Sequence, residues 1–266
     1  MIGCIVQARL GSTRLPRKTM MKIDEENTVL SFLLNQLKHS QLIEKTVVAT
    51  TDLEEDDEIF NYVKKMGIEC FRGSANDVLD RHFQCAKKYN LSKIIRIPSD
   101  KPLIDPEIVD MVVRKFNESN YNYVTNFQPY TFPYGTEVEI FDFETLKKCW
   151  EDSKLPSERE HVTPYIYKNK QKFLCHNVSH QQNYSHLRWE VDRIEDLELV
   201  RKLVSMIKSR PILMKHILEI WKIQPEIFQK NTQNTPNEGY LKSLKEDKNF
   251  LNNKKNSNDD KNEEKN

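Results

Sequence analysis

Residues 5–18 read Ile5-Val6-Gln7-Ala8-Arg9-Leu10-Gly11-Ser12-Thr13-Arg14-Leu15-Pro16-Arg17-Lys18. Apolar residues 2–6 predict a short strand that runs directly into a loop with four cationic side chains. Gly11 and Ser12 allow a tight turn that presents backbone N–H groups, and such a loop suits a polyphosphate. It is neither a Walker A loop nor a GxGxxG loop. Spacing alone leaves a second interpretation equally open, a basic turn at the surface.

Composition excludes several classes of protein. The 266 residues include 38% hydrophobic and 30% charged residues, with a formal net charge of +1. A net charge this close to zero predicts no nucleic-acid or membrane partner. An anion would therefore be bound by a local cluster of cations, such as the loop over residues 9–18. No apolar run reaches the roughly 20 residues of a membrane span, and Met1 leads straight into a strand, without a signal peptide. The five scattered cysteines predict reduced thiols in a cytoplasmic protein.

Strand and helix patterns alternate along the first half of the chain. Apolar spacing predicts helices over residues 28–39, 56–66 and 106–117, with β-branched strands over residues 46–50 and 93–97. Alternation at this spacing is typical of βαβ units and predicts a largely parallel sheet. Further strands are expected at 68–71, 121–127, 137–141 and 187–192, and further helices at 142–150, 194–207 and 211–228.

Two aspartates end predicted strands. Asp100 follows the strand at residues 93–97, and Asp192 ends the strand at residues 187–192. Ligands of open α/β sheets bind beyond the carboxyl ends of the strands, and Mg²⁺ is usually held by one or two carboxylates with phosphate oxygens. Each aspartate also has a structural interpretation. Asp100 can be a turn residue before Pro102, and Asp192 can cap the helix that follows, with Glu195 three residues on.

Other polar residues admit two interpretations as well. Arg81 can pair with Asp77 or Asp80 on its own helix or reach a ligand, whereas Asp105, before Pro106, is expected to cap a helix. Ser157 and Glu160 have capping-box spacing, so Arg159 and His161 are either surface residues or substrate ligands. The spacing of His176 and His180 is a weak metal signal, and we expect polar loop residues there.

Five separated blocks resemble one family. They are residues 8–18, 73–81, 100–106, 135–139 and 188–192. In this order they resemble the cytidylyltransferases that make CMP-activated sugar acids, nearest to the SpsF-like spore-coat polysaccharide branch and related to the CMP-KDO and acylneuraminate enzymes. The resemblance implies a three-layer α/β/α Rossmann-like fold with a mostly parallel sheet and a small β extension. Residues 1–230 would form the nucleotidyltransferase domain, with acceptor binding and dimerisation within 121–190.

The resemblance also implies an activity. The chain would transfer CMP from CTP to a sugar acid and release pyrophosphate for surface polysaccharide or glycan synthesis, as a homodimer that uses Mg²⁺. Asp100 and Asp192 would bind the metal and, with Arg14 and Lys18, would be catalytic. The nucleotide would contact Ala8, Arg9, Gly11, Ser12, Arg14, Lys18, Arg81 and Ser99. The acceptor would contact Gly135, Glu137, Arg159 and His161.

One residue departs from the family pattern, and other functions remain open. Lys101 stands where relatives often carry a small or acidic residue, and it adds a cation beside the proposed metal. This cation leaves open an acceptor with an extra phosphate or carboxylate and argues against KDO itself. A glycosyltransferase of similar fold would use a nucleotide-sugar donor, and a non-catalytic nucleotide-binding protein would need the basic loop but not both aspartates. Residues 231–266 are rich in Asn, Lys, Asp and Glu, which predicts a mostly disordered tail with one frayed helix near Leu241.

Overall fold

A single seven-stranded sheet organises the chain, in the order β3-β2-β1-β4-β6-β5-β7. The computed structural model describes residues 1–231 and 238–263, and side chains are described for residues 1–229 and 238–253. The strands are β1 (Ile2–Gln7), β2 (Lys45–Thr51), β3 (Glu69–Gly73), β4 (Lys93–Pro98), β5 (Tyr123–Thr125), β6 (Glu139–Asp142) and β7 (Cys175–Asn177).

The sheet is mostly parallel, as predicted. Strands β3, β2, β1 and β4 run parallel, whereas β6 is antiparallel to both β4 and β5, and β7 is parallel to β5. The predicted β extension therefore continues the same sheet. Successive residues of β1 belong to different cores, because Cys4 and Val6 pack on one face and Ile5 on the other. Burial on both faces explains the unbroken apolar run.

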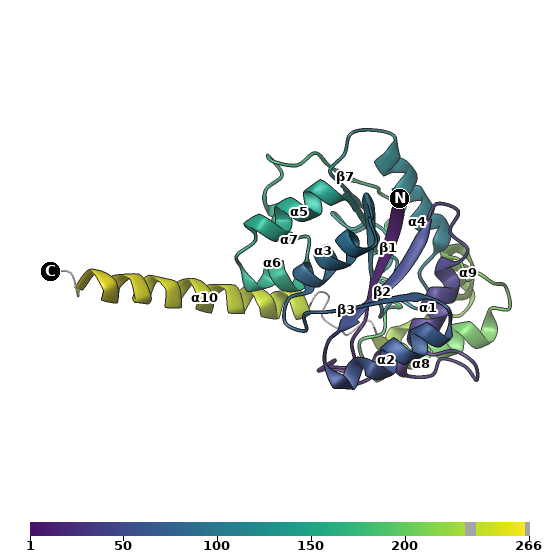
Figure 1. The fold of residues 1–266 in the computed structure, drawn as a ribbon. Helices are drawn as coiled ribbons and strands as arrows, with labels where there is room; N and C mark the ends of the chain where they lie inside the picture. Colours follow the sequence, from purple (N-terminus) through teal and green to yellow (C-terminus); the bar gives the residue numbers. More distant parts are fainter. Residues whose placement is uncertain (232–237, 264–266) are drawn as a thin grey trace.

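Helices cover both faces of the sheet and complete three layers (Figure 1). One face packs against α1 (Val29–Leu37), α2 (Asp57–Lys65) and α4 (Pro106–Asn117). The other packs against α3 (Val78–Lys88), α5 (Phe143–Asp152) and α7 (Pro164–Lys168). A third apolar cluster, built around Trp189, joins α8 (Ile194–Met206) and α9 (Met214–Ile223) to the body.

Local signals predict some elements better than others. Helix α4 has the predicted bounds, and the Asp105 side chain caps it by accepting from the N–H of Glu107 at 2.8 Å. The segment predicted as a strand over 187–192 is no strand of the sheet, and among the described residues its one β bridge joins Tyr134 and Arg188. The predicted helix over 211–228 is divided into α9 and a 3₁₀ helix, Pro225–Asn231.

Helix α6 (Pro156–His161) begins differently from the prediction. The side chain of Glu158 accepts from the backbone N–H of Leu155 at 3.3 Å, so Glu158 and not Glu160 completes the helix start. The capping box predicted for Ser157 and Glu160 is therefore wrong. Glu160 is left free to pair with another element.

Composition predicts a mostly disordered tail over residues 231–266, but most of this tail forms helix α10 (Glu238–Glu263). Residues 232–237 and 264–266 lie outside the described residues. Figure 1 shows this helix beginning against the body near α6 and projecting away from it. Its attachment is polar, because the Asp247 carboxylate accepts from the backbone N–H of Ser157 at 2.8 Å and from its hydroxyl at 2.6 Å. A prediction from apolar content does not register contacts of this kind.

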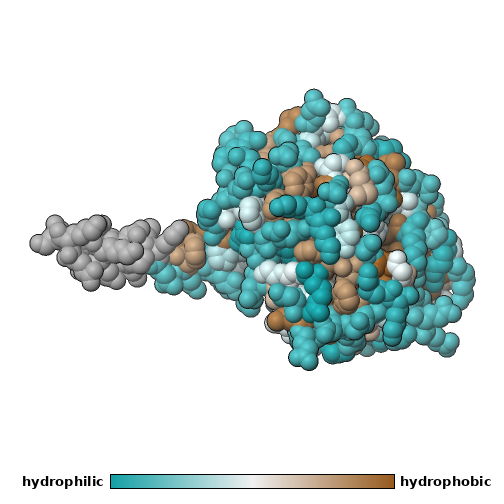
Figure 2. All heavy atoms as spheres, in the orientation of Figure 1, coloured by the Kyte–Doolittle hydropathy of each residue, from teal (hydrophilic) through white to brown (hydrophobic). Residues whose placement is uncertain are grey.

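The surface is largely polar. Figure 2 shows hydrophilic side chains over most of the visible face, with small hydrophobic patches between them. Within the described part of the chain, no helix combines the length and apolar character needed to cross a membrane.

Candidate active site

A cavity of about 1160 Å³ opens beyond the carboxyl ends of β1 and β4. Its walls come from the loop after β1, the residues after β4, the segment that carries Glu190 and Asp192, helix α6 and the first turns of α10. This is the edge at which ligands of α/β sheets bind. The volume suits a nucleoside triphosphate together with a second small molecule.

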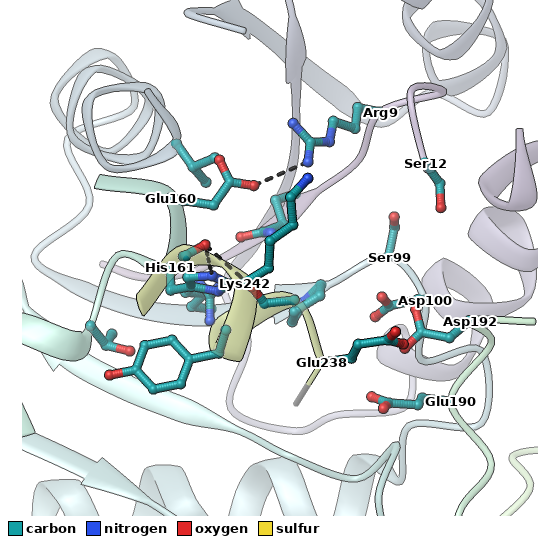
Figure 3. A pocket seen from close by; sticks show the side chains of 18 of the residues that line it. Arg9, Ser12, Ser99, Asp100, Glu160, His161, Glu190, Asp192, Glu238 and Lys242 are labelled. Atoms are coloured by element: carbon teal, nitrogen blue, oxygen red, sulfur yellow. Dashed lines mark hydrogen bonds and ion pairs between the residues drawn. The ribbon is translucent and has the colours of Figure 1, made fainter. Parts of the chain in front are cut away.

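Lys18 stands between the two predicted aspartates. Its Nζ donates to Oδ2 of Asp100 at 2.9 Å and to Oδ1 of Asp192 at 2.7 Å. The backbone N–H of Val191 donates to the carbonyl oxygen of Asp100 at 2.7 Å, which ties the two carboxylate-bearing segments together. Figure 3 shows the two carboxylates side by side in the cavity. The chain therefore brings Lys18, Asp100 and Asp192 to one point.

Asp192 is the most heavily paired carboxylate of the cavity. Its Oδ1 also accepts from Arg14 at 2.7 Å, and its Oδ2 accepts from Arg188 at 2.9 Å. Burial alone would raise the pKa of Asp192, but Lys18 and Arg14 outweigh that effect and hold it well below its usual range. The carboxylate thus stays ionised across the physiological range.

The alternative role of Asp192 as a helix cap is wrong. Asp196, in the first turn of α8, accepts from the backbone N–H groups of Asp192 and Arg193 at 2.9 Å each. This satisfies the helix start and leaves the Asp192 side chain for the cavity.

Asp100 retains one oxygen that fits a metal. Its Oδ1 is buried and has no hydrogen-bond partner among the described residues. An orphaned buried carboxylate oxygen beside a second carboxylate is the donor set that Mg²⁺ takes when phosphates supply further ligands. No cluster of three or more histidine, cysteine or acidic side chains suited to a metal occurs in the described chain, which includes His176 and His180. A metal here would need oxygens from the substrate or from water.

The loop after β1 directs three of its four cations into the cavity. Arg9, Arg14 and Lys18 line it, with Ala8, Gly11, Ser12 and Ser99 between them. Arg17 lies outside the cavity lining and pairs with Glu58 instead. Arg9 donates to Glu160 of α6 at 3.0 Å, a contact between partly exposed side chains that a ligand can exchange.

Arg81 does not pair with either aspartate of its own helix, so that alternative is wrong. The side chain is buried, with 2% of its surface exposed, and its guanidinium donates to the carbonyl of Ser74 at 2.7 Å. Its Nε is buried without a partner in the described structure. Burial lowers the pKa of Arg81, and the positive charge of Arg9 lowers it further. The charges of Glu160, Asp56 and Asp52 act in the opposite direction, but none of these acids forms an ion pair with Arg81 in the described structure.

The predicted acceptor residues of α6 are already engaged. Arg159 forms an ion pair with Asp77, which also caps α3, and donates to the carbonyl of Trp150 at 2.9 Å. His161 makes a 3.0 Å hydrogen bond through Nε2 with the hydroxyl of Ser243 in α10. Burial lowers the pKa of His161 to about 4, with smaller contributions from Arg96 and Arg9. Both side chains border the cavity, and both support its walls.

Glu137 and Lys101 form a buried ion pair. Lys101 Nζ lies 2.7 Å from Oε2 of Glu137, and both side chains are less than 9% exposed. The expectation that Lys101 offers a free cation to the acceptor is therefore wrong. Gly135 is outside the cavity lining, where its N–H donates to Glu137 at 2.8 Å. Its φ of 102° is one that side chains rarely tolerate.

Two contributors were missed by sequence reasoning. Glu190 lines the cavity between Arg188 and Glu137, and burial with the charge of Glu137 raises the pKa of Glu190 to about 8. Its position two residues before Asp192 could have placed it there. Helix α10 adds Glu238, Tyr240 and Lys242 to the lining, and no motif in the tail signals this.

Comparison with known proteins identifies the family of the chain. The family model described as cytidylyltransferase matches residues 3–255. The spore coat polysaccharide biosynthesis protein SpsF of Bacillus subtilis is 31% identical over 216 residues, which cover 78% of this chain and 88% of that protein.

Solved structures show the same fold. A cytidylyltransferase from Leptospira borgpetersenii serovar Hardjo-bovis superposes with a TM-score of 0.82 at 37% identity, covering 86% of this chain and 97% of that one. A CMP:2-keto-3-deoxy-manno-octonic acid synthetase complexed with CTP has a TM-score of 0.60 at 15% identity, covering 77% and 98%, and shares the fold. The chain therefore belongs to the cytidylyltransferase family.

Proposed function

We propose that this protein transfers CMP from CTP to a hydroxyl group of a sugar acid and releases pyrophosphate, in the synthesis of a surface polysaccharide or glycan. One observation carries the proposal: Lys18 binds Asp100 and Asp192 together at the edge of a cavity that the basic loop also lines. Relatives named for spore-coat polysaccharide synthesis and for KDO cytidylyl transfer support the substrate class.

The chain's own groups would hold the triphosphate for in-line attack. Arg14 and Lys18 would exchange part of their bonding to Asp192 for phosphate oxygens and neutralise charge on the departing pyrophosphate. The sugar oxygen would form a bond to the α-phosphorus as the bond to the bridging oxygen breaks, and the hydroxyl proton would leave to solvent. Asp100 and Asp192 would hold Mg²⁺, which orients phosphates and polarises the phosphoryl group when bound.

The acceptor would occupy the part of the cavity beyond the aspartates. Glu137 and Glu190 lie there, and Tyr130 stacks on Tyr134 at a ring separation of 4.3 Å. Carboxyl groups, ionised or protonated, hydrogen-bond to sugar hydroxyls, and aromatic faces pack on sugar rings. Since Lys101 is neutralised by Glu137, the acceptor's own acid group would need cations from another wall.

Pyrophosphate release tests the proposal. The full chain is incubated with CTP, Mg²⁺ and a panel of sugar acids, with the matching neutral sugars as controls, and pyrophosphate is measured. At least one sugar acid should give CTP-dependent release, which Asp100→Asn abolishes and Glu195→Gln, an exposed carboxylate of α8, leaves intact. A glycosyltransferase would release no pyrophosphate, and a binding protein would give no product. Either result would refute the proposed reaction.

A further inference from the structure

Helix α10 forms one wall of the cavity. Residues of its first turns, among them Glu238, Tyr240 and Lys242, line the same space as the basic loop and the aspartates. Figure 3 shows Glu238 close to Asp192, and Lys242 reaching toward Arg9 and Glu160. The helix therefore runs from the aspartate end of the cavity to the outer end of the basic loop.

Polar contacts over three turns hold this wall in place. Glu238 pairs with Arg193 at 3.0 Å at the start of the helix. Ser243 bonds to His161, and Asp247 receives the N–H and hydroxyl of Ser157 at the start of α6. Ser243 and Asp247 are each only 6% exposed, so these bonds are sheltered from water. The position of the first turns is thus fixed by the body of the protein.

Lys242 differs from the cations of the basic loop that line the cavity. Arg9, Arg14 and Lys18 each have a carboxylate partner. The side chain of Lys242 makes no hydrogen bond or ion pair within the described part of the chain, although it reaches into a space that Arg9 also borders. Arg81, whose pKa the charge of Arg9 lowers, has no ion-pair partner there either. Arg9 is paired with Glu160, whereas the side chains of Lys242 and Arg81 have no ion-pair partner in the described structure.

We propose that α10 is a substrate-binding wall and that Lys242 binds a phosphate oxygen of the bound nucleotide. This rests on the proposed function, because it takes CTP as that nucleotide. A phosphate is favoured because Arg9 lies on the same loop as Arg14 and Lys18. An anion bound between Lys242 and Arg9 would therefore be continuous with a triphosphate on that loop. The tail of the chain then contributes directly to nucleotide affinity.

Calorimetric titration of the full chain with CTP and with cytidine tests the assignment. Lys242→Gln should weaken CTP binding about tenfold, which corresponds to 1.4 kcal/mol, and leave cytidine binding unchanged. Lys248→Gln is the matched control, since Lys248 is exposed on the same helix and outside the cavity lining. The assignment fails if CTP affinity stays within about twofold of the wild type, as it would if Lys242 served an acceptor carboxylate.

A second variant tests whether helix α10 helps to bind CTP or instead blocks its access to the cavity. Asp247→Asn weakens the attachment of α10 to α6 without changing any side chain that lines the cavity. If α10 binds the nucleotide, this variant should also lose CTP affinity, and a gain in affinity would overturn the proposal. Failure of the wild type to bind CTP would instead refute the proposed function, so the two failures are distinguishable.

Discussion

Replacing Lys18 by methionine removes the cation that Asp100 and Asp192 share. The Lys18 side chain is 10% exposed, and removal of one partner from a buried ion pair costs about 3–5 kcal/mol. Asp192 keeps Arg14 and Arg188, so a loss near the lower end, about 3 kcal/mol, is expected. For a chain of this size that loss corresponds to a fall in Tm of roughly 6–12 °C.

Urea denaturation of the variant and the wild type across a range of pH measures this loss. In the wild type the depressed pKa of Asp192 contributes stability above the unfolded pKa of about 4, and this is lost as pH falls further. Without Lys18 that contribution shrinks, so the two proteins should converge in stability below about pH 4. Lys202→Met, on the exposed face of α8, is the control. A difference under about 1 kcal/mol at pH 7, or one that persists unchanged at low pH, would refute the reasoning.

Three further predictions concern single positions. Asp100→Asn should lower turnover at least about 100-fold with the far-UV spectrum and Tm little changed, and near-normal activity with Mg²⁺ would contradict its role. Burial holds the pKa of His161 near 4, below the value of 6.5 in the unfolded chain. The neutral imidazole therefore contributes its full stability above pH 6.5, and the free energy of unfolding falls by up to about 3 kcal/mol as pH falls toward 4. His161→Gln should flatten this part of the denaturation profile, and equal pH dependence in both proteins would exclude the effect. Gly135→Ala should cost about 1–3 kcal/mol in thermal denaturation, since φ is 102° and a Cβ would lie 2.8 Å from the backbone nitrogen of Glu190; an unchanged Tm would show that the turn adapts.

Much of the fold could be predicted because its signals are local. Alternating apolar strands and amphipathic helices carry their periodicity in neighbouring residues, and the Asp105-Pro106 cap fixes the start of α4. The place of Asp100 could be predicted from topology, because it follows β4 and ligands bind beyond the carboxyl ends of the strands. Asp192 lies beside it although residues 187–192 are no strand of the sheet, because the N–H of Val191 donates to the carbonyl of Asp100.

The errors arise where the outcome depends on residues distant in the chain. Whether Lys101 is free depends on Glu137, and whether Arg159 is free depends on Asp77, neither of which spacing along the chain reveals. For Asp192, a second acid at position 196 takes the capping role, so the first is available to the cavity. A frayed helix was expected near Leu241, but the extent of α10 was underestimated because its attachment to α6 is polar, whereas the prediction considered apolar burial.

Crystals of the full chain grown with CTP and Mn²⁺ would test the central claim, that the two aspartates and the basic loop meet on one metal-bound triphosphate. The account predicts a single anomalous peak within coordination distance, about 2.0–2.3 Å, of oxygens from Asp100, Asp192 and the triphosphate, with Arg14 and Lys18 on the phosphates. A metal bound away from either aspartate, or a triphosphate lying outside the basic loop, would contradict it.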